Sequence, residues 1–145
     1  MFKRILVALD GSQQSEAALR KAVELQKLCG ADLLTLTVYR HHSHLEASLS
    51  MVRPEKPVSI DEGMREHAKE IAEHGKALAR EAGAPGLRAF VKSGPPARQI
   101  VAFAREHEVD LIVLGSRGLG SLEDYLLGSV SHKVTGLSEC PVLVV

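Results

Sequence analysis

A glycine-rich segment with hydroxyl side chains follows a short apolar run and leads into a predicted helix. Residues 115–131 read GSRGLGSLEDYLLGSVS, with glycines at 115, 118, 120 and 128. Glycine lets a ligand approach the backbone closely, and a helix N-terminus offers N–H groups and a partial positive charge to an anion. The segment therefore predicts a phosphate-binding loop, in which Ser129 caps the helix and the hydroxyls of Ser129 and Ser131 add donors. It is not a Walker A loop, because GxxxxGK[ST] is absent.

Asp10 is a second polar group that directly follows an apolar run. Residues 5–9 (ILVAL) and 111–114 (LIVL) are continuously apolar, which is typical of central strands covered on both faces. Ligands of open parallel sheets bind beyond the carboxyl ends of the strands, where the strand order reverses. If these two strands are neighbours, Asp10 and the glycine segment line one crevice.

Strand and helix patterns alternate along the chain. Ser12 and Gly30 are predicted to cap the first helix. Further strands are predicted at 33–38, 87–92 and 142–145, and further helices from Asp61 or Glu62, from the Pro95-Pro96 turn and from Ser129. This order indicates an α/β fold with a parallel sheet and helices on both faces, with the charged strand 87–92 at an edge. Residues 39–60 lack periodicity, and a loop of this length is expected to be mobile or functional.

The composition narrows the class of protein. With 145 residues, the chain is expected to form one domain. Its formal net charge of zero and its 3% aromatic residues argue against nucleic acid or an anionic membrane as a partner. Two distant cysteines, Cys29 and Cys140, are expected to be free and buried. No signal peptide or membrane-length apolar run is present, so a cytoplasmic location is expected.

The clustered histidines His41, His42 and His44 form the only histidine-rich tract. A single tract inside an irregular segment lacks the fixed geometry and supporting hydrogen bonds of a metal centre. We therefore predict no protein-held metal site.

The glycine spacing, together with most of the chain, resembles the universal stress protein family. Gly115, Gly118 and Gly128 follow the pattern G-x2-G-x9-G-S, and ILVALDGSQQSEAAL, DLIVLGSRG and GSVSHKVTGLSECPVLVV resemble that family in order and spacing. The resemblance implies an open, Rossmann-like sheet of five parallel strands in the order 3-2-1-4-5. It also implies the ATP-binding branch of the family, and a homodimer paired through Val142–Val145.

The resemblance further implies a role for each matching residue. Asp10 would accept hydrogen bonds from the ribose hydroxyls, and Val38 would contact the adenine. Gly120 is the glycine of the segment least expected to touch ligand. The expected nucleotide-binding residues are Ala8, Leu9, Asp10, Val38, Gly115, Arg117, Gly118, Gly128, Ser129, Val130 and Ser131. ATP would bring Mg or Mn, bound through its phosphates.

Three functions remain open at this point. The first is an ATP-binding stress-response regulator or sensor that reports nucleotide state to an unidentified protein partner. The second is a slow ATPase or an enzyme that phosphorylates itself at Ser129 or Ser131, although no catalytic base or Walker B acid is recognisable. The third is a nucleotide-independent interaction module that uses segment 39–60 and the dimer surface.

Overall fold

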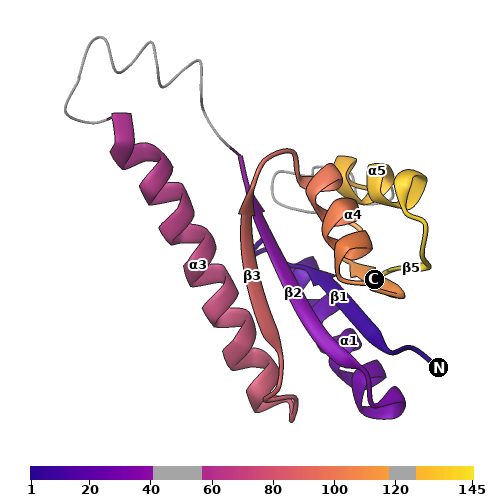
Figure 1. The fold of residues 1–145 in the computed structure, drawn as a ribbon. Coiled ribbons are helices and arrows are strands. Elements are labelled where there is room, and N and C mark those ends of the chain that lie inside the picture. Colours follow the sequence, from indigo (N-terminus) through magenta and orange to yellow (C-terminus); the bar gives the residue numbers. More distant parts are fainter. Residues whose placement is uncertain (41–56, 118–126) are drawn as a thin grey trace.

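The fold is an open parallel sheet with helices on both faces (Figure 1). The computed structural model describes residues 1–40, 57–117 and 127–145. The elements are β1 (Arg4–Ala8), α1 (Gln13–Cys29), β2 (Asp32–Tyr39), α3 (Pro57–Glu81), β3 (Arg88–Ser93), α4 (Pro96–Glu106), β4 (Leu111–Leu114), α5 (Ser129–Leu137) and β5 (Val142–Val144). The strand order is β3-β2-β1-β4-β5, and every neighbouring pair is parallel. The predicted fold class and strand order are confirmed.

The two apolar runs are adjacent central strands. β1 lies between β2 and β4, and Val7 is in register with Val113. Ile5, Leu6 and Val7 are fully buried because both faces of the sheet are covered. Because β1 and β4 are neighbours, the condition under which Asp10 and Gly115 line one crevice is met.

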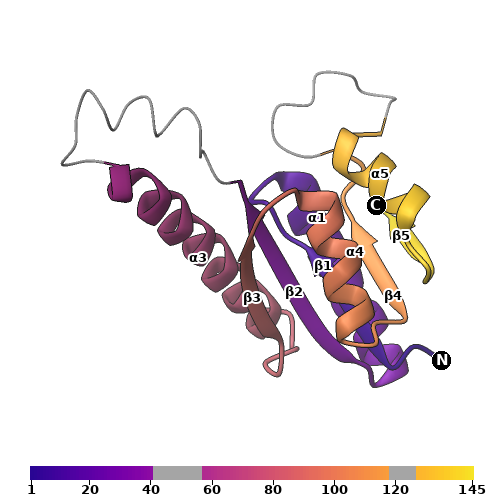
Figure 2. The same cartoon turned by 45° about the horizontal axis from the view of Figure 1, so that its top comes forward.

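Alternate residues of the sheet supply two separate apolar cores. Ile5 and Val7 pack on the side of α1 and α3, whereas Leu6 and Ile112 pack on the side of α4 and α5. Figures 1 and 2 show these two helix layers on opposite faces of the sheet. None of the helices in the described ranges has an apolar stretch long enough to cross a membrane.

The predicted caps of α1 are confirmed. Ser12 has extended backbone angles (φ −75°, ψ 160°), and its Oγ accepts the Ser15 N–H across 3.2 Å. Gly30 ends the helix in the left-handed region at φ 69°, where its N–H donates to the carbonyl of Gln26 across 2.8 Å.

Several predicted boundaries and burial states are corrected. α3 begins at Pro57 and not at Asp61 or Glu62, because a proline fits the first helical turn, where an N–H has no partner. Tyr39 extends β2, so only Arg40 and residues 57–60 of the predicted loop are described, and residues 41–56 with their histidines lie outside. The cysteines Cys29 and Cys140 are free but only half-buried, contrary to the expectation of full burial.

Candidate functional site

A cavity of about 270 Å³ lies at the carboxyl ends of β1, β2 and β4. Residues from both ends of the glycine segment and from the start of α4 also line it. The expected binding residues that line it are Ala8, Leu9, Asp10, Val38, Gly115, Arg117, Gly128, Ser129, Val130 and Ser131. Gly118 and Gly120 lie outside the described residues. Every described residue of the expected set therefore lines one cavity.

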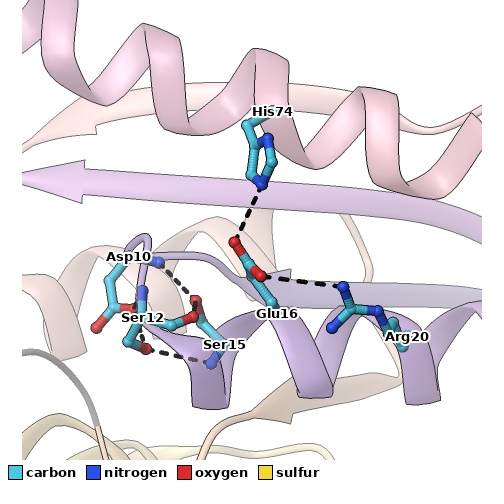
Figure 3. A network of polar contacts seen from close by, with 6 residues as sticks. All are labelled: Asp10, Ser12, Ser15, Glu16, Arg20 and His74. Atoms are coloured by element: carbon cyan, nitrogen blue, oxygen red, sulfur yellow. Dashed lines mark hydrogen bonds and ion pairs between the residues drawn. The ribbon is translucent and has the colours of Figure 1, made fainter.

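Asp10 is held in place by the first turn of α1 (Figure 3). Its Oδ1 accepts the backbone N–H of Ser12 across 2.9 Å and the Ser12 hydroxyl across 2.5 Å. Its own N–H donates to Ser15 Oγ across 3.3 Å, and that hydroxyl donates to the Ser12 carbonyl across 3.0 Å. The turn is completed by Gly11 at φ 88°, a left-handed conformation that favours glycine. The carboxylate is thus positioned before any ligand arrives.

The polar contacts continue from α1 to α3. Glu16 lies one residue beyond Ser15, and its Oε1 is 3.1 Å from His74 Nε2 on α3. Arg20 lies 4.0 Å from the other oxygen of the same carboxylate. His74 and Arg20 are largely exposed, so each pair contributes at most about 1 kcal/mol. The contacts join the two helices (Figure 3), and none of these three residues lines the cavity.

The N-terminus of α5 is open toward the cavity. Gly128 is the N-cap residue, with φ −64° and ψ 160°, and as a glycine it makes no side-chain capping hydrogen bond. The prediction that Ser129 caps the helix is therefore wrong, since Ser129 is its first helical residue. The first N–H groups of a helix have no partner within the helix. Because Gly128 has no side chain to cap the helix, the amides of Ser129 and Val130 are candidate donors to an anion.

Gly115 is required by packing as well as by access to the cavity. A Cβ at this position would lie 2.8 Å from the carbonyl carbon of Gln14 and 2.9 Å from its oxygen. The backbone of α1 cannot move away without displacing the helix that holds Asp10. This close approach could not be predicted from the sequence, because it joins residues about one hundred positions apart.

The cavity has further lining residues that sequence reasoning missed, including Arg40, Pro96 and Ile100. Arg40 directly follows β2, two residues beyond Val38, and both residues line the cavity. Pro96 and Ile100 come from the first turns of α4, and Ile100 is buried. Val38, Pro96 and Ile100 therefore give the cavity an apolar lining beside β2 and α4. The N-terminus of α5 lines the same cavity.

The charged side chains among the described lining residues of the cavity are mostly positive. Asp10 is the one carboxylate among its described lining residues, against the two guanidinium groups of Arg40 and Arg117. No histidine or lysine lines it within the described ranges. Over those ranges, no group of three or more His, Cys, Asp and Glu side chains could hold a metal ion. Among the described lining residues, Asp10 is the one candidate base for activating water. Its carboxylate already accepts a hydrogen bond from the Ser12 hydroxyl.

Known proteins match this chain over its full length. The family model described as the universal stress protein family matches residues 1–145. Universal stress protein YxiE of Bacillus subtilis is 43% identical over 148 residues, covering 100% of this chain and 99% of that protein. Among solved structures, universal stress protein UspA from Lactobacillus plantarum has a TM-score of 0.83 at 27% identity, covering 99% of this chain and 97% of that one.

A second similar solved structure contains a bound ligand. It is a universal stress protein in complex with cAMP, with a TM-score of 0.71 at 26% identity, covering 99% of this chain and 96% of that one. The family model and the B. subtilis relative agree over the whole described fold. This chain therefore belongs to the universal stress protein family.

Proposed function

We propose that the cavity binds ATP, with Mg or Mn held through the phosphates, and that the protein reports nucleotide state as a regulator in a stress response. The observation that carries this proposal is the open N-terminus of α5, which lines the same cavity as the carboxylate of Asp10. The solved relative in complex with cAMP supports the choice of an adenine nucleotide.

The two ends of the cavity suit the two ends of a nucleotide. Val38, Pro96 and Ile100 offer apolar contact to a base. The amides of Ser129 and Val130 and the exposed side chain of Ser129 offer donors to phosphate oxygens, and the helix dipole favours the negative charge. Asp10 follows β1, which lies between β2 and β4, and its carboxylate would accept from the ribose hydroxyls. The guanidinium of Arg117 would add positive charge for the phosphates, and Gly118 would also contact them.

Calorimetric titration tests this proposal directly. Folded protein is titrated with ATP, ADP, AMP, cAMP and adenosine, each with Mg²⁺, and the ligand carried through purification is identified by mass after denaturation. We expect affinity to rise from adenosine to ATP, because each phosphate adds charge at α5. Gly136→Ala, an exposed change at the far end of α5 with no atom within 4 Å of the added methyl group, should bind like the wild type. Binding of no adenine nucleotide by folded protein would contradict the proposal.

The proposal includes a homodimer formed through β5, in the cytoplasm. β5 is an edge strand with half-buried apolar side chains. Pro141 and Val145 direct their carbonyl oxygens to β4 and its following residues. Since hydrogen bonds alternate between the two sides of a strand, the N–H of Val144 points to the open edge. Val144→Pro removes this donor and should give a monomer in sedimentation equilibrium. A variant that stays dimeric would exclude β5 pairing.

A further inference from the structure

The hydroxyl of Ser131 lies among backbone carbonyl groups. Its Oγ is 2.9 Å from the carbonyl oxygen of Ser116 and 3.0 Å from that of Gly128. A carbonyl oxygen only accepts, so the hydroxyl must be the donor in either contact. Ser131 is 4% exposed, which keeps water from replacing these acceptors. The one hydrogen of this hydroxyl is therefore used inside the protein.

The Ser116 carbonyl joins the two ends of the glycine segment. Besides the Ser131 hydroxyl, it accepts the N–H of Gly128 across 2.7 Å. A carbonyl oxygen has two lone pairs, and these two donors occupy both of them. Ser116 follows β4 and Gly128 immediately precedes α5. Ser116, Gly128 and Ser131 thus form a hydrogen-bonded unit, called the latch below. This unit fixes where α5 begins relative to the end of β4.

We propose that Ser131 is a positioning residue of the phosphate site, and that its hydroxyl donates to the latch and not to the ligand. The inference rests on the proposed nucleotide function. Phosphate oxygens only accept hydrogen bonds, so Ser131 could donate to them only by releasing the Ser116 and Gly128 carbonyls. The latch holds the open amides of Ser129 and Val130 toward the cavity, and a preorganised site does not have to order itself when a ligand binds.

Ser129 provides the matched contrast. It is two residues away in the same helical turn, it is exposed, and it lines the same cavity. Its side chain, but not that of Ser131, is placed to donate to a phosphate. Ser129→Ala should therefore weaken binding without changing the ligand-free protein, whereas Ser131→Ala should change the protein before any ligand is added.

Amide hydrogen exchange in the ligand-free protein separates the two roles. The exchange rate of the Gly128 amide is measured by NMR in the wild type, Ser131→Ala, Ser129→Ala and Ser131→Thr, with circular dichroism as a check on folding. We expect exchange about tenfold faster in Ser131→Ala, because Gly128 N–H loses part of the latch. Ser129→Ala should match the wild type, and Ser131→Thr, which keeps the hydroxyl, should restore protection.

Affinity measurements complete the test. Both alanine variants should bind ATP at least fivefold more weakly, with no change for adenosine. If the Gly128 amide of Ser131→Ala exchanges at the wild-type rate, the proposal is overturned. A fall in ATP affinity in that case would make Ser131 a direct ligand, and an unchanged affinity would give it neither role. If the wild type binds no nucleotide, the proposed function fails while the exchange measurement still decides whether the latch exists.

Discussion

The carboxylate of Asp10 accepts two hydrogen bonds from Ser12, one from its backbone N–H and one from its hydroxyl. The same Ser12 oxygen accepts the Ser15 N–H and so caps α1. One side chain therefore starts the helix and orients the acid that lines the cavity. Ser12 therefore contributes both to the start of α1 and to the proposed ligand site.

Ser12→Ala should lower both stability and affinity. Loss of the cap should decrease the free energy of unfolding by about 1 kcal/mol. Loss of the Asp10 contact should weaken nucleotide binding, because the carboxylate is no longer held in one orientation. Urea denaturation and calorimetric titration measure the two effects. Gln13→Ala, an exposed change one residue along α1, should alter neither, and equal losses in the two variants would refute the assigned role.

Asp10→Asn should reduce the ability of the protein to distinguish AMP from 2′-deoxy-AMP. If Asp10 accepts from the ribose 2′-hydroxyl, removal of the charge and removal of that hydroxyl act on the same hydrogen bond. The two changes should then be non-additive by about fivefold in affinity, or about 1 kcal/mol of coupling. Calorimetric titration of both ligands on both proteins completes the cycle. Strict additivity would place the ribose hydroxyl elsewhere.

Gly115→Ala should destabilise the fold by about 2 kcal/mol, because the added methyl group meets the backbone of Gln14. The chain offers a matched control in Gly136→Ala, where the methyl group meets nothing within 4 Å and removes a helical glycine. That variant should be neutral or more stable by about 0.5 kcal/mol. Thermal and urea unfolding of the two variants test the contrast, which would be disproved by equal stabilities.

Asp110 should make the fold sensitive to acid. Burial raises the pKa of its carboxyl, but hydrogen bonds from the backbone N–H groups of Lys3 and Arg4 outweigh burial and leave the pKa below its usual value. A carboxyl with a lowered folded-state pKa stabilises the fold above its unfolded pKa, near 4, and loses that contribution as the pH falls further.

Urea unfolding between pH 6 and pH 2 checks this prediction. Asp110→Asn should be less stable than the wild type at pH 6, and the difference should shrink toward pH 2. Asp32→Asn removes an exposed carboxylate that forms an ion pair with Arg4 at 3.5 Å, so its effect should be small at every pH. A constant difference between Asp110→Asn and the wild type would contradict the assignment.

The sequence was sufficient to predict the sheet and most of the cavity because both depend on strand ends. Continuous apolar runs identify β1 and β4 as central, and the residue that follows such a run in a parallel sheet must lie at the carboxyl edge. Asp10 and Gly115 were therefore predictable as residues of that edge, and that they lie near each other follows from the observed pairing of β1 with β4. The order of the outer strands came from the family resemblance, which encodes contacts that periodicity cannot supply.

Other features were not predictable because they depend on how helices approach the sheet. Pro96 and Ile100 line the cavity only because α4 begins beside the end of β2. Gly128 and not Ser129 is the cap, since the helix begins at Ser129, one residue earlier than the hydroxyl pattern indicated. The hydroxyl of Ser131 reaches a carbonyl fifteen residues away. The local sequence contains no pattern that predicts any of these three features.

The backbone of Ser116 has a wider consequence. Its carbonyl holds the start of α5, and its N–H donates across 2.8 Å to the carbonyl of Val145, which follows β5. One residue thus connects the phosphate end of the cavity to the edge of the sheet. A ligand that shifts this residue changes the free energy of whatever binds at the edge, and an edge partner must change the affinity for ligand by the same factor. Ser116 therefore gives one hydrogen-bonded connection between these two parts of the molecule.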